Sequence, residues 1–135
     1  MTNISSKKKI ELIAKAALAK KAKDVVLLDL RRLSSVCDYF IIASGDSTTQ
    51  LAAIAGNIEK ELLKRNCKLW HKEGKAEALW ILLDYGDIVV HAFYRDTRGF
   101  YNLERLWHDA PHRKLKESTF GRKPRRSVRK TKRRT

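Results

Sequence analysis

The apolar residues of this 135-residue chain recur with regular periods up to Pro111 and thin out sharply after it. Before that point they are dense enough to form a core, whereas only three large apolar residues follow it. A segment with so little apolar surface to bury cannot offset the conformational entropy that is lost on ordering. We therefore expect one folded domain over residues 1–111 and a disordered tail over residues 112–135.

Positive charge is concentrated in this tail. The chain has a formal net charge of +15, and residues 112–135 hold twelve of its 30 lysines and arginines but only one of its 15 acidic residues. A flexible polycation neutralises phosphates and releases their counterions. We expect the tail to contact the RNA backbone without reading bases; the alternative is an extension that only aids solubility. The residues expected to make this contact are Arg122, Lys123, Arg125, Arg126, Arg129, Lys130, Lys132, Arg133 and Arg134.

Composition limits the class of protein further. Hydrophobic residues make up 43% of the chain, which is enough for a globular core. No apolar run approaches the roughly 20 residues that span a bilayer, so no membrane partner is expected. The polar start, Met1 to Lys9, has no long apolar stretch after it, which favours a cytoplasmic location or the interior of an organelle over secretion. Cys37 and Cys67 have the spacing of neither a zinc site nor a disulfide framework, and we expect buried free thiols.

Hydrophobic periodicity predicts an α/β fold with the element order α-β-β-α-β-β-β-α. Ser47 and Gln50 have the spacing of a capping box at the start of the middle helix. Residues 85–87 are a turn signal, so the last two strands are expected to pair as an antiparallel hairpin. With the middle helix as a crossover, the prediction is one small domain with a five-stranded mixed sheet and flanking helices. The predicted helices are residues 6–21, 47–64 and 100–107, and the predicted strands are residues 24–30, 38–44, 67–71, 79–84 and 88–94.

Motifs for catalysis and phosphate binding are missing from the sequence. It contains no GxxxxGK[ST], GxGxxG, HExxH or GxSxG pattern. The turn at residues 44–47, Ser-Gly-Asp-Ser, could bind an anion, but a helix cap explains it better. A nucleotidyltransferase would need two carboxylates one residue apart on a following strand, and Asp84 and Asp87 lack this spacing. With His91 expected to be structural, we predict no enzymatic activity, no metal site and no cofactor.

Aromatic residues gather in and after the predicted hairpin instead. Large aromatic side chains supply hot spots at interfaces, although they also fill protein cores. Glu104 and Arg105 lie between apolar positions, which suits either a polar rim around an apolar contact or a solvated face. These features favour a binding protein. The aromatic residues are Trp80, Tyr85, Phe93, Tyr94, Phe100, Tyr101 and Trp107.

Four stretches of the chain form a specific pattern by their order and spacing. They are residues 24–30 (DVVLLDL), 38–45 (DYFIIASG), 80–93 (WILLDYGDIVVHAF) and 100–107 (FYNLERLW), accompanied by Ser47, Gln50, residues 53–55 and Glu73-Gly74. This pattern resembles the ribosomal silencing factor family, RsfS, also called Iojap-like. The resemblance extends from about Ser6 to Ala110.

The resemblance implies a fold similar in topology to nucleotidyltransferases, without their catalytic carboxylates. It also implies binding to the large ribosomal subunit through ribosomal protein L-fourteen, on the face that meets the small subunit. A factor bound there sterically blocks association with the small subunit and represses translation under nutrient limitation. Members of the family are also seen as homodimers, so a second copy of the chain is a candidate partner.

The same resemblance indicates which side chains face the partner. The expected contact residues are Trp80, Tyr101, Leu103 and Trp107, with Asp84 and Glu104 meeting basic residues of the ribosomal protein. Two other functions stay open on the sequence alone. One is a general RNA-binding module that acts through the tail, and the other is a nucleotidyltransferase-related enzyme with a rearranged metal site.

Overall fold

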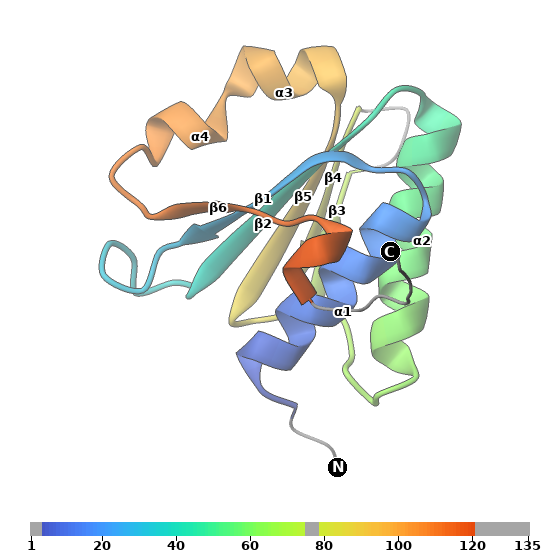
Figure 1. The fold of residues 1–135 in the computed structure, drawn as a ribbon, viewed down its shortest axis with the longest axis horizontal. Coiled ribbons are helices and arrows are strands. Elements are labelled where there is room, and N and C mark those ends of the chain that lie inside the picture. Colours follow the sequence, from blue (N-terminus) through green and yellow to red (C-terminus); the bar gives the residue numbers. More distant parts are fainter. Residues whose placement is uncertain (1–3, 75–78, 121–135) are drawn as a thin grey trace, which may run out of the picture.

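The computed structural model describes residues 4–74 and 79–120. Within these ranges, six strands form one mixed sheet in the order β3-β4-β5-β2-β1-β6. Helices α1 and α2 cover one face of the sheet, and the segment that contains α3 and α4 lies against the other (Figure 1). The elements are α1 (Ser6–Ala19), β1 (Lys23–Asp29), β2 (Tyr39–Gly45), α2 (Thr48–Leu63), β3 (His71–Glu73), β4 (Trp80–Asp84), β5 (Ile88–Tyr94), α3 (Arg95–Tyr101), α4 (Leu103–Leu106), β6 (His112–Lys114) and η2 (Glu117–Phe120).

The predicted cap of the middle helix is present at the start of α2. The Ser47 hydroxyl accepts a hydrogen bond from the backbone N–H of Gln50 at 3.0 Å. The Gln50 side chain does not return to Ser47, because its oxygen accepts from the backbone N–H of Asp46 at 2.6 Å. Its amide nitrogen donates to the carbonyls of Lys20 and Lys21. This one side chain therefore ties the start of α2 to the end of α1.

Strand pairing confirms the expected mixed sheet. β1 and β2 are antiparallel, and so are β4 and β5, which form the predicted hairpin. β2 and β5 run parallel, with Ile42 opposite His91. Parallel neighbours need a long crossover connection, and α2 with β3 and β4 supplies it. Residues 88–93 of β5 are all buried, as expected for a central strand that is covered on both faces.

The core is divided by the sheet into two apolar clusters. The larger cluster lies under α1 and α2, where Ile13, Ile54 and Ile58 are fully buried. The smaller cluster lies on the opposite face around Leu28 and Phe93. Only the larger cluster is sealed by long amphipathic helices, so the two faces of the sheet differ in how well they are covered.

Ordered structure continues past Pro111, so the prediction that residues 112–135 are disordered is wrong for residues 112–120. β6 pairs antiparallel with β1, which adds a sixth strand to the five that were expected. Leu115 is 2% exposed and packs into the larger cluster, and Phe120 is partly buried against it. Composition counts apolar surface and misses the backbone hydrogen bonds that an unpaired sheet edge offers. Arg122 to Arg134, the basic residues assigned to RNA contact, lie outside the described residues.

Two elements differ from their predicted bounds. The single helix expected over residues 100–107 is two short helices, because Asn102 between α3 and α4 has a φ of 45°. Asparagine tolerates this left-handed conformation, and its side chain then caps α4 by accepting from the N–H of Arg105. The strand expected over residues 67–71 begins only at His71, where pairing with β4 starts.

Of the two free cysteines, Cys37 is buried as expected and Cys67 is half-buried.

Candidate functional site

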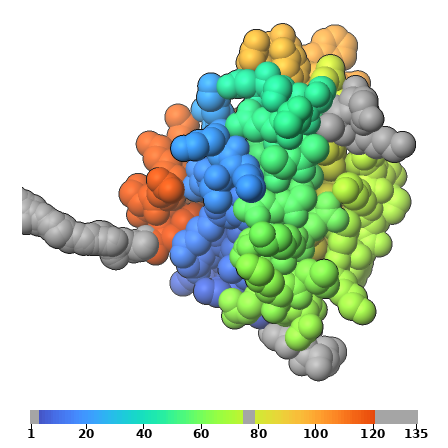
Figure 2. Space-filling view, turned by 90° about the vertical axis from the view of Figure 1, so that its right-hand side faces the viewer, coloured from blue at the N-terminus to red at the C-terminus, as the bar shows by residue number. Residues whose placement is uncertain are grey.

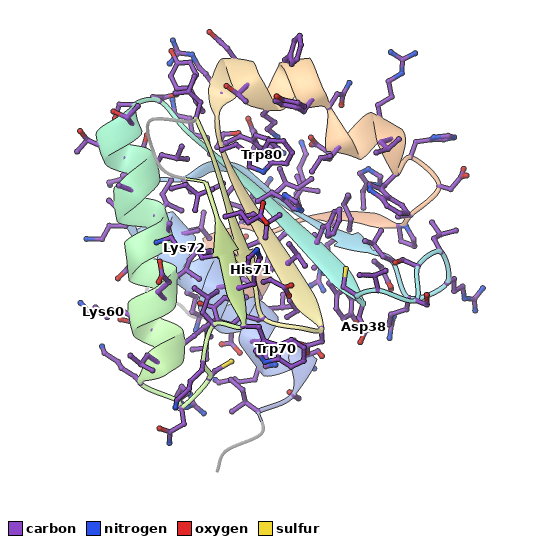
Figure 3. All side chains as sticks on the ribbon, turned by 180° about the vertical axis from the view of Figure 1, so that it is seen from behind. Asp38, Lys60, Trp70, His71, Lys72 and Trp80 are labelled. Carbon is purple, nitrogen blue, oxygen red and sulfur yellow. The ribbon has the colours of Figure 1, made fainter. Side chains whose placement is uncertain are left out.

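The sheet face opposite α1 and α2, hereafter the open face, is incompletely covered. Figure 3 views the molecule from this side. The α3–α4 segment covers part of the face, and several large apolar side chains around the smaller cluster stay half-buried. They are Phe40, Trp80, Leu82, Leu103 and Trp107. Apolar side chains that a fold leaves partly exposed and contiguous mark binding surfaces more often than isolated ones do.

Trp80 lies at the centre of aromatic contacts on this face. Its ring centroid is 4.8 Å from that of Phe93 and 4.7 Å from that of Tyr101. Its indole N–H donates to Nδ1 of His91 at 3.2 Å. These contacts fix the orientation of a half-buried tryptophan, so little side-chain entropy is left to lose on binding.

His91 supports Trp80 only as a neutral imidazole. Burial lowers the pKa of His91 to about 4, because the charged form would lose its hydration. A neutral imidazole has one unprotonated nitrogen, and because the Trp80 N–H donates to Nδ1, that nitrogen is Nδ1. Nε2 of His91 has no hydrogen-bond partner within the described part of the chain. The structural role of His91 is to hold the Trp80 side chain in its orientation.

The α3–α4 segment adds exposed apolar side chains beside the open face. Phe100 is 81% exposed, Tyr101 49% and Leu106 70%. A hollow of about 360 Å³ lies between the start of β4 and α3, with Trp80, Phe100 and Tyr101 in its wall. Within the described ranges, the open face and this segment together present exposed aromatic and aliphatic groups, as a protein interface requires at its centre.

An arginine that the sequence reasoning missed holds this segment in place. The Arg98 guanidinium donates to both carboxylate oxygens of Glu104, at 3.2 and 2.8 Å. It also donates to the Asp24 carbonyl and the Ser44 hydroxyl, at 2.7 Å each. Arg98 thus links α3 and α4 to the ends of β1 and β2. No sequence motif signals it, since its acceptors are 6 to 74 positions away.

The predicted contact residues fall into two groups. Trp80, Tyr101, Leu103 and Trp107 lie on the open face and on the α3–α4 segment beside it. Asp84 is at the far end of β4 and accepts from the N–H of Gly86 at 2.8 Å. Because side chains alternate along a strand, Trp80, Leu82 and Asp84 share one face of β4.

Trp70 is a second exposed tryptophan, and the sequence motifs do not include it. It is 76% exposed, and its indole lies against Gly86, where an added Cβ would come within 2.9 Å of the ring. Its backbone N–H donates to the carbonyl of Asp84. Figure 3 shows Trp80 and Trp70 toward opposite ends of the strands on this side of the molecule.

The turn at residues 44–47, the candidate anion site of the sequence, already holds ion pairs of its own. Asp46 contacts Lys23 at 2.7 Å and Arg95 at 3.3 Å, and these cations hold the pKa of Asp46 below its ordinary value.

Across residues 4–74 and 79–120, His, Cys, Asp and Glu side chains do not gather in groups of three that could bind a metal ion. None of the helices in these ranges has the length and apolar character that crossing a membrane requires.

Comparison with known proteins identifies the family of the chain. Residues 3–135 match the family described as "Ribosomal silencing factor during starvation". The ribosomal silencing factor RsfS of Bacillus subtilis is 42% identical over 118 residues, which cover 87% of this chain and 98% of that protein. The chloroplastic protein Iojap of Zea mays is 39% identical over 98 residues, covering 73% of this chain and 42% of that protein.

Solved structures show the same fold. A crystal structure of a Bacillus halodurans protein is similar with a TM-score of 0.72 and 37% identity, covering 82% of this chain and all of that one. A Chromobacterium violaceum protein gives a TM-score of 0.75 at 31% identity, with 78% and 88% coverage. The chain therefore belongs to the RsfS/Iojap-like family of ribosomal silencing factors.

Proposed function

We propose that this protein binds the large ribosomal subunit through ribosomal protein L-fourteen and sterically blocks association with the small subunit. Translation would then be repressed when nutrients are limiting. The relatives named as ribosomal silencing factors support this role. A mouse relative, 30% identical over 108 residues, is named for assembly of the mitochondrial ribosomal large subunit, which supports the choice of subunit.

The observation that carries the proposal is the fixed, half-buried Trp80 within the open face. Interfaces place rigid aromatic anchors at the centre and polar groups at the rim. Tyr101, Leu103 and Trp107 extend the apolar centre, and they come from an element that Arg98 already holds in place. An interface of standard size buries roughly 800 Å² on each partner and, centred on Trp80, would extend to the edge of this face.

Charged residues at the rim would select the partner. Asp84 and Glu104 would meet basic residues of the ribosomal protein, which favours correct orientation more than it adds affinity. Glu104 is also held by Arg98, and its side chain keeps 29% exposure in that ion pair. The Glu104 carboxylate would therefore already be in position when the partner binds.

The proposed action needs occupancy and no turnover. A factor that covers the joining face competes by mass action, so its effect follows its concentration divided by its dissociation constant. In this proposal the protein is a regulator and not an enzyme, it works without a cofactor, and it acts in the cytoplasm.

Binding of the full chain to purified L-fourteen, measured by biolayer interferometry, tests the partner and the face together. Trp80→Ala should weaken binding at least tenfold, as expected for a central hot spot. Leu63→Ala is the matched control, since Leu63 is 59% exposed on α2, away from the open face. Equal affinity of all three proteins, with unchanged circular dichroism, would remove the open face from the proposal.

A further inference from the structure

Positive charge is in excess at the β6 edge of the sheet. Six exposed cations come from β6, from the turn that follows it and from the two ends of α1, and we refer to them as the basic edge. They are Lys7, Lys20, Lys21, Arg113, Lys114 and Lys116. Within residues 4–74 and 79–120, none of the six lies within 4.0 Å of a carboxylate oxygen.

Neighbouring cations on the same elements are paired, which sets the basic edge apart. On α1, Lys8 and Lys15 share the carboxylate of Glu11, and Lys9 contacts Asp87 at 2.9 Å. These pairs engage Glu11 and Asp87. In the described ranges, the six cations of the basic edge make no ion pair and outnumber Asp24 and Glu117, the acidic side chains beside them.

The basic edge borders two hollows on either side of the C-terminal segment. One, of about 770 Å³, has Lys7 and Arg113 in its wall, together with Glu11 and Asp29, which are paired with other cations. The other, of about 420 Å³, has Lys21, Lys114 and Lys116, opposed by Asp24 and Glu117. Figure 2 shows the surface of residues 112–120, in orange-red, beside the blue surface of α1.

The ordinary role of cations on an edge strand is to prevent pairing with another sheet. That role explains charges on β6 itself, but it does not require Lys7, Lys20 and Lys21 on the adjacent helix. Cations that converge from two elements on shared hollows are typical of surfaces that follow a phosphate backbone. The sequence also continues from residue 121 with nine further lysines and arginines and no acidic residue.

We propose that the basic edge binds the phosphate backbone of RNA, as a second surface of the folded domain. For a protein of a ribosome-binding family, ribosomal RNA is the accessible polyanion. The edge is four strand positions from β4, which is roughly 19 Å at the usual strand spacing. RNA on the basic edge therefore leaves the Trp80 region of the open face accessible, and the two surfaces can act at the same time.

The test measures binding of the full chain to a fluorescein-labelled single-stranded oligouridylate over a series of KCl concentrations. The variant R113Q/K114Q/K116Q removes three cations of the basic edge. Its matched control, K60Q/R65Q/K68Q, removes three exposed cations at and after the end of α2, which also lack an ion pair in the described ranges. Both variants have the same net charge, so any difference in their RNA binding is due to where the removed cations lie.

We expect the edge variant to bind more weakly and to lower the slope of log Kd against log salt by about 2, while the control keeps the wild-type slope. Equal slopes for the two variants would overturn the proposal and assign binding to net charge or to residues beyond 120. If the edge variant loses its thermal unfolding transition, K7Q/K20Q/K21Q tests the same surface from α1. Because naked RNA contains no ribosomal protein, the result is independent of the open face and of subunit joining.

Discussion

Removing the Arg98 side chain should release the α3–α4 segment from the sheet. The Arg98 side chain is 11% exposed, and its guanidinium donates to the Glu104 carboxylate, the Ser44 hydroxyl and the Asp24 carbonyl. In Arg98→Ala these acceptors lose their donor, and Ser44, only 4% exposed, can recover little hydration. Hydrogen bonds to charged groups contribute about 1.5–3 kcal/mol. Partial exposure of Glu104 reduces the sum, so we expect a loss of about 2–3 kcal/mol.

Hydrogen exchange is the assay that localises this loss. A penalty of about 2 kcal/mol raises the population of the open segment roughly 30-fold, so amides of residues 95–107 should exchange correspondingly faster. The core strand β5 should change less, because the larger cluster does not depend on α3. Arg95→Ala is the control on the same helix, since Arg95 is exposed and its ion pair with Asp46 is at the surface. Equal exchange in the two variants would refute the view that Arg98 holds the segment.

Three further predictions concern His91, Leu115 and Asp87. The pKa of His91 in the folded protein is about 4, below the value of about 6.5 expected in the unfolded chain. The contribution of neutral His91 to stability should therefore be fully present above pH 6.5 and fall as the pH drops toward 4. An NMR titration midpoint near 6.5 would contradict this. Leu115→Ala should cost about 2–4 kcal/mol in urea unfolding and expose the amides of β6, whereas an unchanged midpoint would mean that β6 is held without its anchor. Burial alone would raise the pKa of Asp87, but hydrogen bonds from Ser6 and Lys9 outweigh it and the pKa is lowered. Asp87 therefore stabilises the fold above the carboxyl pKa of the unfolded chain, and this contribution is lost as the pH falls through the pKa of the folded protein. The free energies of unfolding of the wild type and Asp87→Asn, plotted against pH, should converge in acid. Parallel curves would exclude this role.

Much of the fold follows from hydrophobic periodicity. The alternation and β-branched runs of β1, β2, β4 and β5 placed these strands within one or two residues of their observed bounds. β6 was missed because its stability comes from pairing with the edge of β1 and from one buried leucine, and neither is visible in a basic, apolar-poor segment. The break at Asn102 was missed for a similar reason, since periodicity continues across a single left-handed residue.

The candidate site was less accessible to sequence reasoning. Alternation shows that Trp80, Leu82 and Asp84 share a face of β4, but it does not show whether another element covers that face. The resemblance to the family supplied Tyr101, Leu103 and Trp107. The structure brings Tyr101 next to Trp80 and packs Leu103 and Trp107 against the smaller cluster. Arg98 could not be predicted, because its role depends on acceptors from β1, β2 and α4 that meet only in three dimensions.

Subunit joining on a sucrose gradient tests the central claim most directly. Purified large subunits are incubated with the full chain before small subunits are added, in parallel with Trp80→Ala and the Leu63→Ala control. We predict that the wild-type protein and the control sediment with the large subunit and reduce the coupled-ribosome peak, while Trp80→Ala leaves that peak close to its level without protein. Full joining in the presence of saturating wild-type protein would contradict steric blocking.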